Sequence, residues 1–162
     1  MNVTLVPFGN AHFRAGKLAC QHGPTECVAN SFEQCAIDLY PDFRVHYPFY
    51  LCMERLGARM VKEAATCART AGLDIEKIEG CVFDPVKSAA LQHRFAALTP
   101  KDHKYTPWVV VDGNLSKSNG DKLLEEVCAA YTGEPPPGCT DLARRQPRVC
   151  LNEAHAVVDD DE

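Results

Sequence analysis

The chain has 162 residues, 46% of them apolar, and these values predict a single globular domain with a buried core. A formal net charge of −5 and the lack of a basic stripe argue against a nucleic-acid-binding protein. No apolar run approaches the ~18–20 residues that a helix needs to cross a bilayer, so we expect no membrane span.

The first part of the chain predicts a strand, a loop and a helix. Residues 3–8 are apolar and rich in β-branched side chains, which is typical of a strand. Residues 11–19 follow as a loop. A helix is expected over residues 24–40, because Pro24 suits the first helical position and Pro41 ends the helix.

Further helices are predicted up to residue 98. The first covers residues 48–70, with a proline at its start and Gly72 as its cap. Residues 75–78 suggest a short helical turn. A last helix of this group covers residues 85–98, where Asp84 is the expected N-cap.

The pattern then changes to a hairpin, a helix and a tail. Residues 108–111 predict a strand, Asp112-Gly113 a hairpin turn, and residues 115–117 a short return strand. Residues 121–131 carry apolar side chains at helical spacing. Residues 141–162 are polar, and we expect them to form a mostly disordered tail.

Nine cysteines are the most unusual feature of the composition. A cytosolic protein seldom carries so many unless it binds metal, and zinc sites pair their ligands at gaps of about two to four residues. No such pair occurs here, and the histidines are scattered, so we expect neither a metal site nor a cofactor. The cysteines instead predict a disulfide framework in an oxidising compartment. They are Cys20, Cys27, Cys35, Cys52, Cys67, Cys81, Cys128, Cys139 and Cys150.

Two N-glycosylation sequons, at Asn2 and Asn114, agree with an exported protein, although such triplets also arise by chance. The sequence shows no signal peptide, because no charged segment is followed by a long apolar one at its start. We therefore expect a truncated or processed N-terminus; the alternative is a cytosolic chain with free thiols.

Residues 20–35 carry the specific motif C-Q-H-G-x-x-E-C-x-x-N-x-x-x-x-C. This motif resembles the signature of the gamma-interferon-inducible lysosomal thiol reductase (GILT) family. Residues 2–11 resemble the strand that precedes that signature, and the blocks around Cys52 and Cys67 also match. Residues 105–113 resemble the family's Y-x-P-W-V-x-V-N-G block, with an aspartate in place of the asparagine. The resemblance covers about residues 2–139.

The resemblance implies an α/β, thioredoxin-like fold with a disulfide-rich helical insertion at about residues 20–98. One such domain would occupy residues 1–140, and the polar tail residues 141–162. In the family a catalytic C-x-x-C lies between the first strand and the first helix, and this chain contains no C-x-x-C. We therefore expect the first strand and first helix to be missing. Since that strand is central, the chain alone should be unstable or aggregate.

The resemblance also implies an enzyme that reduces protein disulfides in acidic endolysosomes, through thiolate attack and a mixed disulfide. Its partners would be disulfide-containing proteins, and its location lysosomal or secreted. Thr106 and Pro107 are the part of the active site that remains, where a cis proline would contact the substrate chain. Without the dithiol we expect no catalytic residue and little or no activity. The alternative is a non-catalytic secreted or lysosomal glycoprotein that binds unfolded or cysteine-rich chains.

Helix geometry restricts the disulfide pairing of four cysteines. Cys27 and Cys35 would lie ~12 Å apart on one helix, and Cys52 and Cys67 ~22 Å apart unless Gly57 breaks theirs. A disulfide needs Cα atoms closer than ~7 Å. We therefore expect these four to pair between elements, and the cysteines of the motif not to pair with one another.

The remaining residues of interest have mainly structural interpretations. Cys128 and Cys139 flank a segment rich in glycine and proline, which allows the chain to fold back and pair them. Cys150 is left over, as a free thiol or an intermolecular bond. His22 is interpreted as part of a hydrogen-bonded turn rather than as a proton donor to a thiol. Glu26 would stabilise the start of a helix.

Overall fold

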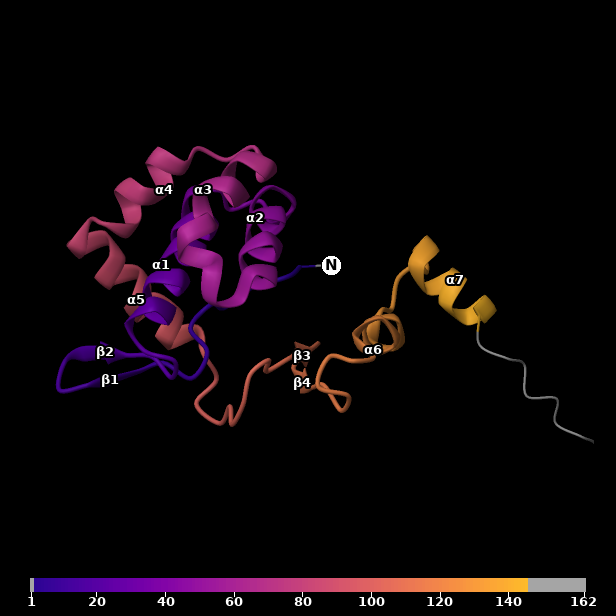
Figure 1. The fold of residues 1–162 in the computed structure, drawn as a ribbon. Helices are drawn as coiled ribbons and strands as arrows, with labels where there is room; N and C mark the ends of the chain where they lie inside the picture. Colours follow the sequence, from indigo (N-terminus) through magenta and orange to yellow (C-terminus); the bar gives the residue numbers. More distant parts are fainter. Residues whose placement is uncertain (1, 146–162) are drawn as a thin grey trace, which may run out of the picture. The chain divides into compact units, whose positions relative to one another are not determined.

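The computed structural model describes residues 2–145 and is rich in helices (Figure 1). The chain divides into two compact units, Met1–Pro107 and Trp108–Glu162. Among residues 2–145, each unit contains one two-stranded antiparallel sheet. Within the described residues, no helix is long and apolar enough to cross a membrane. The expected mixed, helix-rich and disulfide-bonded character is thus confirmed.

Helix α1, Pro24–Leu39, is the central element of the first unit, and four later helices pack against it or against each other (Figure 1). Pro24 stands at its first position, as predicted, and Glu26 lies in its first turn. The later helices are α2 (Phe43–Leu56), α3 (Met60–Ala71), α4 (Ile75–Val82) and α5 (Pro85–Leu98).

Aspartate side chains set the starts of three of these helices. Asp42, Asp74 and Asp84 each accept hydrogen bonds from backbone N–H groups in the first turn that follows. Asp42 therefore starts α2 at Phe43, ahead of Pro48, where the helix was predicted to begin. The short turn predicted at residues 75–78 extends to Val82, whereas the helix at residues 85–98 is confirmed.

The helix predicted over residues 48–70 is two helices, because Gly57 interrupts it. Gly57 has φ of 53°, in the left-handed region that glycine adopts without steric cost. A single 3₁₀ turn, η1 (Gly57–Arg59), then connects α2 to α3. The two helices lie against each other as an antiparallel hairpin (Figure 1).

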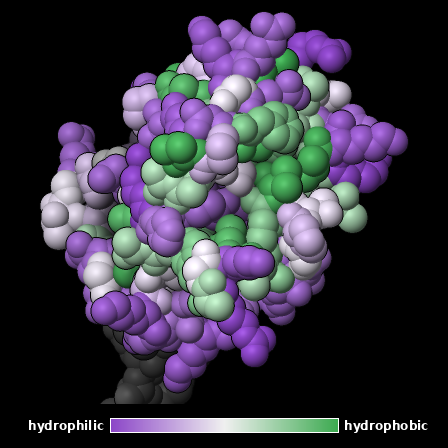
Figure 2. All heavy atoms as spheres, turned by 90° about the vertical axis from the view of Figure 1, so that its left-hand side faces the viewer, coloured by the Kyte–Doolittle hydropathy of each residue, from purple (hydrophilic) through white to green (hydrophobic). Residues whose placement is uncertain are grey.

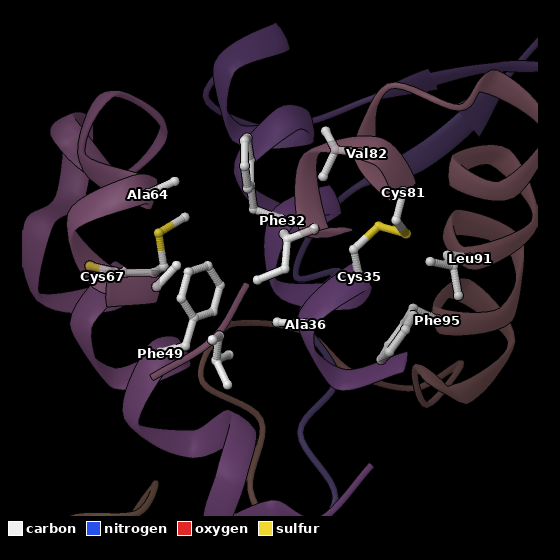
Figure 3. Packing of buried hydrophobic residues seen from close by; sticks show 14 of the residues in the cluster. Phe32, Cys35, Ala36, Phe49, Ala64, Cys67, Cys81, Val82, Leu91 and Phe95 are labelled. Atoms are coloured by element: carbon white, nitrogen blue, oxygen red, sulfur yellow. A yellow bond between two sulfur atoms is a disulfide. The ribbon is translucent and has the colours of Figure 1, made fainter. Parts of the chain in front are cut away.

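Large apolar side chains from four helices form the core of the first unit (Figure 3). They are Phe32 of α1, Phe49 and Met53 of α2, Ile78 of α4 and Phe95 of α5, each at most 3% exposed. Full burial of a side chain of this size contributes about 1.5–3 kcal/mol. The Cys35–Cys81 disulfide lies inside this core and joins α1 to α4 (Figure 3).

The N-terminal segment differs from the prediction. Residues 2–6 have no regular structure and residues 7–10 form turns, so the strand expected at residues 3–8 is wrong. Among the described residues no neighbouring strand pairs with it, and a strand exists only when its backbone is paired.

The predicted loop at residues 11–19 is instead a hairpin. Strand β1 (His12–Arg14) pairs with β2 (Lys17–Ala19), with Phe13 opposite Leu18. Ala15 and Gly16 both have positive φ, as a two-residue hairpin turn of type I′ requires. The usual Asn-Gly or Asp-Gly signal is absent, which is why the sequence did not indicate it.

The second unit begins with the predicted hairpin. Strands β3 (Val110–Val111) and β4 (Asn114–Leu115) pair across Asp112 and Gly113. Helix α6 (Leu123–Ala130) follows, and then α7 (Pro137–Arg145). Helix α7 runs past residue 140, so the first residues of the expected tail are helical; Cys150 lies outside the described residues.

Replacing both Cys35 and Cys81 with alanine should lower the free energy of unfolding of the first unit by about 4 kcal/mol, because their bond closes a 46-residue interval. The matched control replaces Cys128 and Cys139, separated by 11 residues in the second unit, and should leave the first unit intact. Urea unfolding followed by far-ultraviolet circular dichroism measures both. An unchanged midpoint for the Cys35/Cys81 variant would contradict the expectation.

Candidate functional site

The first unit ends at Thr106–Pro107, whose peptide bond is cis, as the resemblance implied. Both residues are exposed. Thr106 lies next to the turn at residues 7–10: a Cβ atom built on Gly9 would be 3.6 Å from Cγ2 of Thr106 and 3.9 Å from Oε1 of Glu26. Three segments distant in sequence therefore meet at Gly9: the N-terminal turn, the start of α1 and the Thr106–Pro107 edge.

Polar side chains of the motif region hold that turn in place. Gln34, fully buried on α1, donates from Nε2 to the carbonyl oxygen of Pro7 at 2.7 Å. Asn30 donates from Nδ2 to the carbonyl oxygen of Phe8 at 3.4 Å. Gln21 accepts from Asn10 at 2.7 Å between side chains. The bonds from Gln34 and Asn30 satisfy backbone carbonyl groups of the turn, and the bond to Gln21 holds its Asn10 side chain, so the motif fixes the shape of the turn.

Glu26 and His22 close the loop before α1. The backbone N–H of His22 donates to Oε2 of Glu26 at 2.5 Å, and the ring Nδ1 lies 3.1 Å from the same oxygen. The His22 side chain is 77% exposed, and its contacts stay within this loop. This geometry supports the structural interpretation of both residues, with Glu26 also placed favourably in the first turn of the helix.

The Cys20–Cys27 disulfide closes the same loop, with Cα atoms 5.6 Å apart. The expectation that cysteines of the motif do not pair with one another is therefore wrong for this pair. The distance argument applies to Cys27 and Cys35, which share α1 and are not bonded to each other. Cys20 lies before the helix, where the chain turns back and the N–H of Gly23 donates to its carbonyl oxygen.

The other disulfides connect separate elements: Cys128 and Cys139 pair as expected, whereas Cys52 and Cys67 bond to each other, which was expected only if Gly57 broke their helix. Cys52–Cys67 joins α2 to α3 across the break at Gly57, and Cys128–Cys139 joins α6 to α7. Together with the Cys20–Cys27 and Cys35–Cys81 bonds, they engage every cysteine of residues 2–145. This part of the chain therefore offers no thiolate for nucleophilic chemistry. It also contains no group of His, Cys, Asp and Glu side chains that could hold a metal ion.

A shallow groove lies on the first unit beside Cys27. Apolar side chains line much of it, among them Leu18, Val28 and Val82, with Ser31 and Gln92 as polar members. Phe83 also lines it and is 69% exposed, which is unusual for a side chain of this size. Figure 2 shows the corresponding mixture of apolar and polar surface on one face of the molecule.

The two predicted glycosylation residues are both exposed. Asn114 lies on β4 and donates from Nδ2 to the carbonyl oxygen of Asp112 at 3.0 Å. Its sequon serine, Ser116, is buried and accepts from the N–H of Gly120. Modification at Asn2 and Asn114 stays a prediction.

Comparison with known proteins shows which proteins this chain resembles. Residues 1–71 match the family model of the gamma interferon inducible lysosomal thiol reductase (GILT). The chain is 33% identical over 160 residues to the gamma-interferon-inducible lysosomal thiol reductase of Mus musculus, covering 93% of this chain and 63% of the relative. It is 32% identical over 167 residues to the protein of that name from Carassius auratus, covering 94% and 64%.

A plant protein is similar to the same extent. The gamma-interferon-responsive lysosomal thiol protein of Arabidopsis thaliana is 31% identical over 160 residues, covering 94% of this chain and 62% of the relative. The chain is thus related to the GILT proteins, and the resemblance predicted from its sequence is confirmed. It spans slightly less than two thirds of the length of these relatives.

Replacing Gln34 with alanine should lower the free energy of unfolding by about 2–3 kcal/mol, because buried polar groups lose their partner. The control replaces the exposed Gln21, which contacts the same turn. This substitution should change the free energy of unfolding by less than ~0.5 kcal/mol. Urea unfolding, combined with hydrogen exchange at Phe8 and Ala11, measures both variants. Equal effects of the two substitutions would contradict the assigned role of Gln34.

Proposed function

We propose that this chain provides the substrate-binding edge and the disulfide-bonded helical body of a GILT-type thiol-disulfide oxidoreductase. Such an enzyme would reduce protein disulfides in an acidic endolysosomal compartment. The observation that carries the proposal is the meeting of the N-terminal turn, the start of α1 and the exposed Thr106–Pro107 edge around Gly9. The similarity to relatives named lysosomal thiol reductases supports the reaction class.

The proposed fold is thioredoxin-like over residues 1–140, with residues 20–98 as a helical insertion. In this arrangement the substrate chain would lie along the exposed residues Thr106 and Pro107. The motif residues would hold the turn at residues 7–10 against this edge without taking part in thiol chemistry.

The chemistry needs a thiolate that attacks the substrate disulfide and a second thiol that resolves the mixed disulfide. Neither is available from residues 2–145, where all cysteines are already bonded. We therefore infer that this chain alone binds disulfide-containing proteins and reduces them little or not at all.

A non-catalytic role as a glycoprotein that binds unfolded or cysteine-rich chains is the second candidate. Two observations favour it: every cysteine of the described residues is bonded, and an apolar groove with the exposed Phe83 lies on the first unit. The two functions place the bound chain differently, at Thr106–Pro107 for a reductase and in the groove for a binding protein.

Substitution of Thr106 with tryptophan should therefore weaken binding of disulfide-bonded insulin by at least about tenfold at pH 5, since the bulky ring would cover the edge. The control Lys101→Trp adds the same ring at another exposed residue and should leave the affinity unchanged. Fluorescence anisotropy measures binding, and turbidity measures insulin reduction, which should stay at background. Loss of binding in Phe83→Asp but not in Thr106→Trp would favour the second function.

We also infer that Asn2 and Asn114 carry N-linked glycans in a lysosomal or secreted form. Exposure of both side chains and the disulfide-rich composition support this inference. Expression through the secretory pathway should give a protein whose mass falls on glycosidase treatment. The variants Asn2→Gln and Asn114→Gln should each remove one glycan, and a mass unaffected by the enzyme would contradict the assignment.

A further inference from the structure

Glu33 is a carboxyl side chain in the interior of the first unit. It lies on α1 next to Phe32 and is 1% exposed. Its Oε1 atom has no hydrogen-bond partner among the described residues. An ionised carboxylate in such surroundings is costly unless a cation or several donors compensate its charge.

Helix α2 supplies the groups that face Glu33, and they are acidic or phenolic. Glu54 is hydrogen-bonded to Glu33, and Tyr50 interacts with both carboxyl groups and with Tyr47. A carboxylate only accepts hydrogen bonds, so a bond between two carboxyl groups requires one of them to be protonated. Glu54 is exposed and Glu33 is buried. The proton therefore belongs on Glu33, whose hydroxyl donates to Glu54.

No cation compensates Glu33 from the other helices packed against α1, as far as the described residues go. Lys87 and Arg94 of α5 pair with Asp38, at 3.6 and 2.7 Å. Lys77 of α4 pairs with Asp74 at 3.3 Å. His46 of α2 is also buried, and its Nδ1 lies 2.8 Å from the carbonyl oxygen of Tyr40 rather than against Glu33.

These surroundings favour the neutral form of Glu33. Burial, then repulsion by Glu54 and the hydrogen bond to it, raise the pKa of the Glu33 carboxyl well above its usual range. The same environment, with burial as the largest cause, raises the pKa of Tyr50, which therefore stays a neutral phenol.

We propose that Glu33 and Glu54 form an acid-dependent lock between α1 and α2. In acid, the protonated Glu33 joins the two helices through its hydrogen bond to Glu54. Towards neutral pH, loss of that proton places a second negative charge inside the unit and weakens the helical packing. The device thus favours the folded unit in an acidic compartment, and it does not rest on the proposed reductase chemistry, because unfolding measurements alone test it.

The direction of the pH dependence follows from proton linkage. The folded chain binds the Glu33 proton more tightly than the unfolded chain does, whose glutamate pKa is ~4.3. The contribution to stability is complete below that pH and is lost as the pH rises through the higher pKa of the folded chain. Between the two values the folding constant falls by up to about tenfold per pH unit.

The variant Glu33→Gln tests the lock, because a glutamine keeps the shape of the protonated acid and cannot ionise. Urea unfolding gives the folding constant of the first unit, which should fall in the wild-type chain as the pH rises from 4.5 to 7. This fall should exceed that of Glu33→Gln by at least about tenfold. The control Glu79→Gln removes an exposed carboxylate of α4 and should follow the wild type. The contribution of Asp74, which is common to all the variants, cancels in this comparison.

Glu54→Gln provides a second, independent variant. Removing its charge ends the repulsion, so the pH dependence should become weaker than that of the wild type while the chain stays folded. Identical pH dependence in the wild type and Glu33→Gln would overturn the proposal. If Glu33→Gln does not fold, the comparison of Glu54→Gln with the wild type decides. An equal pH dependence of stability overturns the proposal, and a weaker pH dependence in Glu54→Gln supports it.

Discussion

The structure of the first unit depends on helix α1 and on the two disulfides that fix it. Cys20–Cys27 binds its first turn to the preceding loop, and Cys35–Cys81 binds its second half to α4. The turns between these two bonds contribute Phe32 to the core that residues of α2 to α5 complete. A helix covalently held at two points cannot slide along its axis. The polar side chains between those points therefore keep a fixed position relative to the N-terminal turn.

This fixed position explains how a motif dense in cysteine can shape the exposed Thr106–Pro107 edge through its amide side chains. Asn30 and Gln34 project from α1 toward carbonyl groups of the turn, and Glu26 lies close to the same turn at Gly9. The turn in turn lies against Thr106. The disulfides fix the position of α1. The hydrogen bonds of Asn30 and Gln34 then fix the turn that lies against Thr106. Covalent and hydrogen-bonded parts of the motif thus have separate tasks.

Short sequence patterns that act locally predicted the helical part of the fold. Features that depend on contacts between distant residues were not predicted. Pro24 and Asp84 mark helix starts by their own chemistry, and the hairpin at Asp112 follows from its turn residues. The segment at residues 3–8 has the composition of a strand but no partner to pair with it. The Cys20–Cys27 bond depends on a reversal of the chain at Gly23 that spacing does not reveal. Similarly, Glu33 looks like an ordinary surface glutamate in the sequence, since only the packed helices determine that it is buried.

The Cys52–Cys67 disulfide has a consequence for the integrity of the chain where proteases are present. It spans the turn at Gly57–Arg59, whose three residues are exposed between two packed helices. A cut after Arg59 would leave α2 and α3 covalently joined, with their apolar faces still buried against α1. The two fragments could not diffuse apart without reduction of this bond and of Cys35–Cys81, which also spans the cut. The exposed peptide bonds of this turn can therefore be cut while the two helices stay joined as a nicked, two-chain form.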